Sequence, residues 1–493
     1  MDPYFTGEPL RIGNETQLLI DDTIIEDRWR LERRLNTPSK YARNPVLVKD
    51  KPWEGDQVIS PTVLWDEAYG RYRMWYTCFN RSHYEAGGGP VYYIAYAESD
   101  DGYTWEKPLF DHCPLGPHKK TNIVYYGTHE QGLPGRKQQR VQKGQIFIDP
   151  ADPDPARRYK LICLEGRPKP ELGEVHSELN LTCSPDGIHW TLWGERSLLD
   201  NHSDCANHVV YNPRAGRWLL YCRPTVYNSG RSGGQRHHRR RVSLMTSTDF
   251  EDWSYPRTVL YPDEYDLPDY DHVHVFPYGN LYLMLYAAME GDDTGRDEIR
   301  LASSADGARW ERFHTRAAFL GRGGDGAWDC GTVIPSGEPV RQGEYLLFYY
   351  SGANLGQHEC GDHQGGAGVA RLKVDRFAGQ WAGDREPGYL LTKEFLLEGS
   401  RLRVNLEPDK RPYYAPRLRA ELLRHPPLGQ HATSKEVYDG FSLDDCDPLT
   451  IDHTDAPLTW RGSPDLSTLK GRPIYVRFEL FQAALYAFRV TDE

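Results

Sequence analysis

The chain has 493 residues, a formal net charge of −12, and many glycines, prolines and tyrosines (46, 35 and 32). A chain of this length can bury more than one hydrophobic core. The negative charge argues against nucleic acid as a partner, and no apolar stretch approaches the roughly 20 residues that a membrane span requires. The amino terminus lacks the pattern of a secretory signal, and nine irregularly spaced cysteines favour reduced thiols, so the sequence predicts a cytoplasmic protein.

Five units with the same internal order fill most of the chain. Each begins with a strand, turns, and continues in an aromatic-rich strand. The predicted pairs are 61–65 with 72–76, 145–148 with 159–164, 207–211 with 218–221, 272–276 with 281–286, and 331–334 with 345–350. A third strand is expected in each unit, at 93–97, 179–182, 242–246, 299–302 and 368–372.

Four of the third strands end in the phrase Ser-x-Asp-Gly-x-x-Trp or a close variant. The copies begin at Ser99, Ser184, Ser247 and Ser304, and Phe250 replaces the glycine in the third copy. The Asp can accept hydrogen bonds from backbone N–H groups two residues on, and the glycine supplies a positive φ. The tryptophan offers a flat apolar body that can seal a neighbouring sheet. The phrase therefore predicts a turn and not a catalytic motif.

Repetition of these units predicts an all-β fold, a five-bladed β-propeller over residues 1–385. Segment 17–21 is expected to pair with the last blade and close the ring, so that no sheet edge stays open. Short alternating segments separated by Pro, Gly and Asp turns follow at 402–404, 417–422, 474–480 and 485–488. They predict a C-terminal β-sandwich over residues 386–493.

Carboxylates recur where the innermost strands begin. The set is Asp56, Asp204, Asp269, Asp271 and Asp329. Because the innermost strands of a propeller surround one axis, we expect these acids to face a common cavity. A glycosidase needs one protonated carboxyl and one ionised carboxylate, and crowding raises at least one pKa. The alternative is that each acid caps a turn or binds backbone N–H groups.

These acids, the Asn44-Pro45-Val46-Leu47 segment and the trailing sandwich resemble the five-bladed β-propeller glycoside hydrolases, including the invertase/fructanase and arabinanase/xylosidase families (32 and 43). The resemblance covers nearly the whole chain. It implies hydrolysis of a glycosidic bond, for example in a fructofuranoside or arabinofuranoside, by paired carboxylates in the central cavity. By that likeness Asp56 is the nucleophile or general base, and Asp204 stabilises the transition state or tunes the acid.

The proton donor stays open because the families' acid motifs are absent as such. Asp271 and Asp329 are preferred over Glu264 and Asp269 because each abuts an inner strand, and His272 is a further candidate. Other residues are expected to bind sugar hydroxyls or to stack on a ring, with structural pairing or core packing as the alternative. This substrate-binding set is Glu165, Arg223, Asp269, Tyr270, His272, Trp328 and His358.

No cofactor is expected, and the sequence leaves open a calcium ion on the propeller axis. The segment His358 to His363 contains zinc-ligand types but no second ligand pair, so it predicts a rim loop and no metal site. The basic run Arg236 to Arg241 is interpreted as a solvated loop. A carbohydrate is the expected partner, and a homo-oligomer stays open. Competing hypotheses are a non-catalytic glycan-binding propeller and a sialidase-like hydrolase, which would need an arginine cluster and a tyrosine nucleophile.

Overall fold

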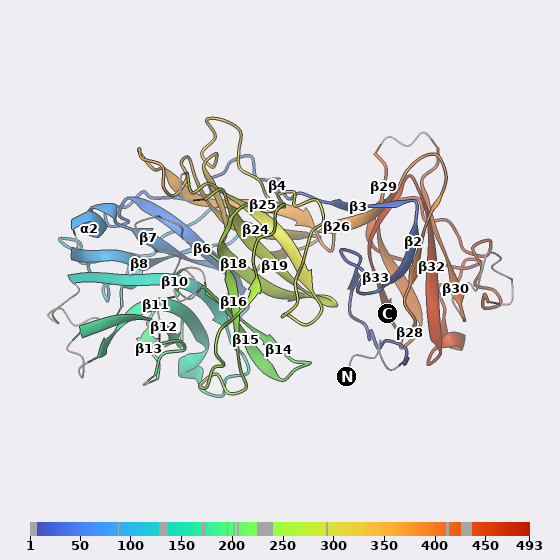
Figure 1. Ribbon diagram of the computed structural model, residues 1–493, viewed down its shortest axis with the longest axis horizontal. Helices are drawn as coiled ribbons and strands as arrows, with labels where there is room; N and C mark the ends of the chain where they lie inside the picture. The colour runs from blue at the N-terminus through green and yellow to red at the C-terminus, as the bar shows by residue number, and fades with distance from the viewer. Residues whose placement is uncertain are drawn as a thin grey trace.

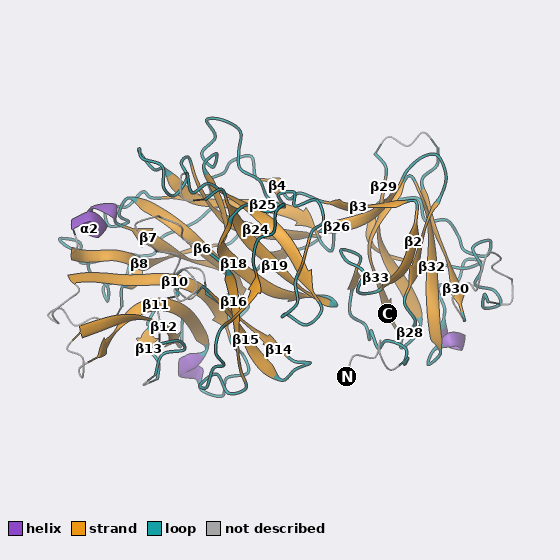
Figure 2. Ribbon diagram, in the orientation of Figure 1, coloured by secondary structure: helices purple, strands orange, loops and turns teal. Residues whose placement is uncertain are grey.

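The computed structural model describes residues 7–86, 88–127, 137–169, 174–194, 196–200, 203–204, 207–223, 240–291, 294–410, 414–424 and 436–493. Strands make up almost all of its regular structure (Figure 2), and the all-β class is confirmed. The helices of the described residues are α2 (Arg81–Ala86) and two 3-10 turns, Pro155–Arg157 and Ser467–Leu469. None of them has the length and apolarity to cross a membrane. The eight cysteines in this part of the chain are free thiols.

Five antiparallel units form the larger lobe, on the left of Figure 1. The first unit contains β6 (Gln57–Asp66), β7 (Arg71–Phe79), β8 (Gly88–Ser99) and β9 (Ile123–Tyr125). The second unit contains β10 (Lys137–Ile148), β11 (Tyr159–Lys169), β12 (Glu174–Ser184) and β13 (Thr191–Leu192). The third unit contains β14 (His208–Asn212), β15 (Arg217–Cys222), β16 (Val242–Ser247) and β17 (Arg257–Leu260). The fourth unit contains β18 (Asp269–Tyr278), β19 (Leu281–Met289), β20 (Asp297–Ser304) and β21 (Glu311–Arg312). The fifth is β22 (Thr332–Pro335), β24 (Tyr345–Ala353) and β25 (Gly365–Lys373), with β23 (Val340–Gln342) beside β24.

The predicted strand pairs are confirmed in all five units. Each first strand pairs antiparallel with the second, and the second pairs antiparallel with the third. These pairs could be predicted because the two strands of each are close in sequence and the second is rich in aromatic residues; β19, for example, is buried along its whole length.

The repeated phrase forms the predicted turn. In the second copy, Ser184 Oγ accepts from Gly187 N (2.8 Å), and Asp186 Oδ1 accepts from Ile188 N (2.8 Å) and His189 N (2.9 Å). Gly187 has a φ of 77°, in the left-handed region that favours glycine. The third copy adopts the same conformation with Phe250 at a φ of 68°.

The turns also join neighbouring units. The carbonyl of Gly187, in the second unit, accepts from Trp75 Nε1 in the first unit (2.7 Å). The carbonyl of Gly102, in the first unit, accepts from Tyr349 OH in the fifth unit (2.8 Å). The first unit is therefore held to both the second and the fifth by the same kind of contact.

Substitution of Gly187 tests this turn contact. A Cβ at Gly187 would lie 2.7 Å from Trp75 Cζ2, and the residue needs a positive φ. Gly343 has a φ of 59° but open space around its Cβ position. We expect Gly187→Ala to lower the free energy of unfolding by about 2–5 kcal/mol, against about 1–2 kcal/mol for Gly343→Ala, which is strained but meets no atoms. Urea unfolding measures both, and equal losses would contradict a packed turn.

Two further sheets enclose a separate core in the second lobe (Figure 1). One contains β1 (Gln17–Leu18), β3 (Leu31–Leu35), β26 (Ala378–Ala382), β29 (Arg401–Pro408), β31 (His453–Pro457) and β33 (Ala483–Thr491). The other contains β2 (Ile25–Trp29), β27 (Gly388–Thr392), β28 (Phe395–Leu396), β30 (Arg417–Leu423) and β32 (Pro473–Phe481). Their shared core includes Phe395, Leu406, Phe478 and Leu485. The strands predicted near 402–404, 417–422, 474–480 and 485–488 are thus confirmed.

The expectation that segment 17–21 pairs with the last blade is wrong. Leu18 pairs with Ala487, so β1 lies in a sheet of the second lobe. The strands that pair with β25 in the fifth unit are β4 (Ser39–Lys40) and β5 (Leu47–Val48). Asn44, between them, donates from Nδ2 to the Val369 carbonyl (2.9 Å) and accepts from Val369 N (3.0 Å). A short alternating segment can pair with the free edge of either sheet. Which edge segment 17–21 pairs with depends on how distant parts of the chain pack, and the local sequence does not show this.

Candidate functional site

Arg223 lies at the centre of a charged network at the starts of the third and fourth innermost strands. Its Nη2 contacts Asp204 Oδ2 (2.7 Å), and its Nη1 donates to the carboxylate of Asp271. The Arg223 side chain is 6% exposed, that of Asp271 is 2% exposed, and that of Asp204 is 36% exposed. Asp204 is therefore the carboxylate of this trio that faces solvent.

Asp271 accepts hydrogen bonds from four side chains. Besides Arg223 they are Arg240 Nη1 (2.6 Å), His272 Nδ1 (2.7 Å) and Gln357 Nε2 (2.6 Å). Burial by itself would raise the pKa of Asp271, but the positive groups of Arg240, His272 and Arg223 outweigh it and hold this pKa well below its usual range. Asp271 stays ionised near neutral pH. The cations around Asp271 argue against its predicted role as proton donor, and that role stays a prediction.

A second buried carboxyl, Asp297, lies beside Asp271. Gln357 Nε2 donates to Asp297 Oδ2 (2.8 Å) as well as to Asp271, and so joins the two acids. Burial, and then the negative charge of Asp271, raise the pKa of Asp297 well above its usual range. Two neighbouring carboxyl groups are thus driven to opposite protonation states, an arrangement typical of catalytic sites. Asp297 is itself fully buried, so it acts through Asp271 and Gln357.

Replacing Asp297 by asparagine tests this protonation state. An acid whose pKa is raised in the folded state makes the protein less stable as pH rises above the unfolded value of about 4. Asparagine keeps an acceptor for Gln357 and cannot ionise. We expect Asp297→Asn to gain stability relative to wild type as pH rises from 4 to 9, measured as melting temperature against pH. Parallel curves for the two proteins would contradict a raised pKa.

Two residues from other segments complete the network: His358, in the loop that follows β24 of the fifth unit, and Arg240, which precedes β16 of the third unit. Arg240 N donates to Asp269 Oδ1 (2.7 Å), and Arg240 Nη2 lies 3.4 Å from His358 Nε2. The Arg240 side chain is 11% exposed, so the interpretation of the whole basic run as a solvated loop is wrong at this residue. Residues 236–239 of that run lie outside the described part of the chain. Six predicted site residues meet here: Asp204, Arg223, Asp269, Asp271, His272 and His358.

Other predicted residues form none of the hydrogen bonds or ion pairs of this network within the described residues. Asp56 is exposed, and its Oδ2 accepts from Arg81 N (2.6 Å) at the start of α2. Asp329 is buried and accepts from Lys40 Nζ (2.6 Å) and Tyr350 OH (2.9 Å). These contacts match the alternative in which aspartates bind backbone N–H groups or structural partners. The catalytic roles of both residues stay predictions.

Three predicted substrate-binding residues serve packing or pairing. Tyr270 is 1% exposed inside the fourth unit, so it has no free ring face to stack on a sugar, and that expectation is wrong. Glu165 is also 1% exposed and accepts from Tyr125 OH (2.7 Å). Trp328 stacks on Tyr350 with ring centroids 5.8 Å apart.

Sequence reasoning missed Arg240, Asp297 and Gln357. Asp297 opens β20, a third strand, whereas the acids that were singled out precede first strands. Gln357 directly precedes His358, which was predicted as a rim residue. Its position beside His358 could therefore have pointed to it. No group of three or more His, Cys, Asp or Glu side chains suited to a metal ion occurs among the residues that the structure describes.

The comparisons with known proteins add similarity at low identity. No protein-family model matches the chain. The A type blood N-acetyl-alpha-D-galactosamine deacetylase of Flavonifractor plautii is 23% identical over 338 residues, which are 60% of this chain and 40% of that protein. The chain thus spans less than half the length of this curated relative.

Solved structures align over about two thirds of the chain. A structure described as a glycoside hydrolase covers 69% of this chain and 92% of its own, with 16% identity and a TM-score of 0.48. Beta-1,2-mannobiose phosphorylase of Listeria innocua covers 69% and 97%, with 13% identity and a TM-score of 0.46. These are proteins that the chain is similar to, and no family membership follows from them.

Proposed function

We propose that the protein is a carbohydrate-active enzyme that hydrolyses a glycosidic bond. The observation that supports this most is that Arg223 joins a partly exposed carboxylate, Asp204, to a buried acid pair. In the proposal Asp204 contacts the sugar and stabilises the positive charge that develops on its ring in the transition state. Arg223 and Asp271 hold Asp204 in place, and a furanoside is the preferred substrate class.

The proposal includes a five-bladed propeller as the scaffold of the site. Contacts between neighbouring units support it, since the first unit bonds to both the second and the fifth. Contacts between innermost strands support it as well, because Lys143 Nζ of β10 donates to Thr62 Oγ1 of β6 (2.7 Å) and His208 Nδ1 of β14 lies 3.1 Å from His274 Nδ1 of β18. Strands that surround one axis bring their starting residues to a common cavity.

We further propose that the second lobe is a β-sandwich domain. The cluster of buried residues shared by its two sheets supports this. The pairing of residues 17–35 with C-terminal strands supports counting that segment with the sandwich. Because β26 pairs with β33, we place the boundary for the rest of the chain between Lys373 and Ala378, a few residues before the expected position at 385.

A second candidate function is removal of an N-acetyl group from an amino sugar. The named activity of the Flavonifractor plautii relative favours it. This reaction cleaves an amide and releases acetate, whereas glycoside hydrolysis releases the aglycone, so the products tell the two apart.

The deciding experiment screens the wild-type protein on nitrophenyl glycosides, including pentofuranosides and an N-acetylgalactosaminide. Release of nitrophenol without added phosphate is the expected result. Release of acetate alone would establish the second candidate, and cleavage that requires phosphate would establish a phosphorylase. Binding of glycans without any turnover would replace the proposal by a glycan-binding protein.

A further inference from the structure

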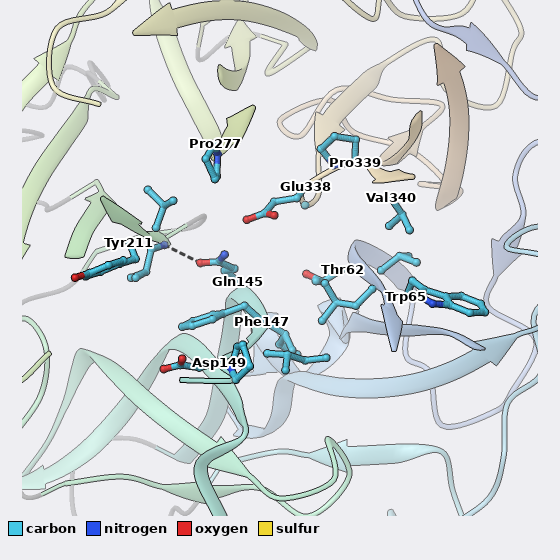
Figure 3. A pocket seen from close by; sticks show the side chains of 18 of the residues that line it. Thr62, Trp65, Gln145, Phe147, Asp149, Tyr211, Pro277, Glu338, Pro339 and Val340 are labelled. Carbon is cyan, nitrogen blue, oxygen red and sulfur yellow. Dashed lines mark hydrogen bonds between the residues drawn. The ribbon is translucent and has the colours of Figure 1, made fainter. Parts of the chain in front are cut away.

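A second cavity lies at the opposite end of the innermost strands from Asp204 and Asp271. It has a volume of about 540 Å³ and is lined by the last residues of β6, β10, β14 and β18 and by the segment that follows β22. Asp271 is near the start of β18, and Pro277 near its end lines this cavity. We call it the far cavity; residues that line it in Figure 3 include Thr62, Trp65, Gln145, Phe147, Tyr211 and Glu338.

The far cavity has apolar walls and a polar centre. Figure 3 shows the Glu338 carboxylate on the side of the Gln145 amide, with Thr62 on the same wall of the cavity as Gln145. Trp65 and Tyr211 are 38% and 44% exposed, although large aromatic side chains are usually covered. A concave apolar pocket with a few convergent polar groups is the common form of a small-molecule site.

The carboxylate of Glu338 has no cationic partner among the described residues. Its nearest ring nitrogen is His208 Nε2, at 3.9 Å. Burial lowers the pKa of His208 to about 3, so this ring is neutral at pH 7. His208 is fully buried, and its Nε2 has no hydrogen-bond partner in the described part of the chain. The far cavity therefore contains an acceptor that a donor from outside could satisfy.

The other charged groups near the far cavity have partners other than Glu338, and the partner of Lys143 is Thr62, which itself lines the cavity. Asp149 Oδ2 pairs with Lys160 Nζ (2.9 Å), and Lys143 Nζ donates to Thr62 Oγ1 (2.7 Å). Arg341 donates from Nε to the Gly343 carbonyl (3.2 Å), and its charge acts on Asp375 and Tyr278. The surrounding cavity walls raise the pKa of Glu338 to about 7, although 44% of its side chain is exposed. An ammonium group placed beside it would offset that cost of burial.

We propose that the far cavity binds a small organic cation, a primary ammonium on a ring-shaped or apolar body. The ammonium pairs with Glu338, and the body packs against the aromatic and aliphatic walls, which include Trp65 and Tyr211. The site is separate from the one assigned to Asp204 and does not depend on the proposed hydrolysis.

Calorimetric titration with benzylammonium and with benzyl alcohol, its neutral counterpart, tests the site. We expect wild type to bind benzylammonium about ten- to a hundredfold more tightly than benzyl alcohol, because an ion pair replaces a neutral hydrogen bond. Glu338→Gln should lose this difference. Glu251→Gln, at an exposed position on an outer turn, should keep it.

Two further measurements keep the result specific to the far cavity. Asp204→Asn should bind benzylammonium like wild type, which separates this cavity from the proposed active site. Benzylammonium binding to wild type should weaken as pH falls below about 7, where Glu338 takes up a proton. Equal affinity of wild type and Glu338→Gln, loss of affinity in Asp204→Asn, or no binding to wild type in the millimolar range would each overturn the proposal.

Discussion

Asp204→Asn is expected to reduce glycoside hydrolysis by about 10²- to 10⁴-fold, the range found when a positioned catalytic carboxylate is removed. Asparagine has nearly the same shape but no charge to stabilise a cationic transition state. Because the Asp204 side chain is 36% exposed and Arg223 keeps its bond to Asp271, the melting temperature should stay close to that of wild type. Steady-state rates and thermal unfolding on the same preparation measure both effects.

Asp252→Asn is the matched control for Asp204→Asn. Asp252 also pairs with an arginine, since its Oδ1 lies 3.5 Å from Arg196 Nη1, but it is 77% exposed on an outer turn. We expect wild-type rates for this variant. Wild-type rates for Asp204→Asn as well would remove Asp204 from the site, and a large loss in both would point to a general effect of charge.

Arg73→Leu is expected to lower the free energy of unfolding by about 3–5 kcal/mol, because it removes the buried partner of the Asp66 carboxylate. Among the described residues, the cation that then remains beside Asp66 is the more distant and more exposed Arg158, whose Nη2 lies 3.5 Å from Asp66 Oδ1. Arg73 Nη1 lies 3.0 Å from Asp66 Oδ2, and the two side chains are 2% and 0% exposed. Arg73 also donates to Tyr159 OH (2.9 Å) and to the Asp186 carbonyl (2.6 Å), both in the second unit. The loss thus includes contacts between two units.

Two companion variants separate the buried charge from other effects. Arg71→Leu removes an arginine two residues away whose side chain is 30% exposed and pairs with Glu98 and Asp100, so its cost should stay below about 1 kcal/mol. Combining Arg73→Leu with Asp66→Leu should recover much of the loss, since no buried charge then remains unpaired. Urea unfolding measures all three, and a double variant as unstable as Arg73→Leu would contradict the assigned cause.

The predictable parts of the candidate site were those that depend on position along a strand. Asp204, Asp269 and Asp271 were found because acids recur at the starts of innermost strands, and strands around one axis bring their starts together. Asp297 could not be found this way, since it begins a third strand and reaches Asp271 through Gln357 of another unit. Its protonation state depends on burial, which the local sequence does not encode.

Local sequence is sufficient for the turns and the hairpins. The Ser-x-Asp-Gly phrase forms its own hydrogen bonds, and the two strands of each hairpin lie close together in sequence. The edge that the amino-terminal strands cover, and the side chains that surround Asp271, depend on packing between distant segments. The physical reason is the distance in sequence between interacting residues. The hydrogen bonds of a turn join residues a few positions apart, whereas strand edges and buried charges find partners in distant parts of the chain.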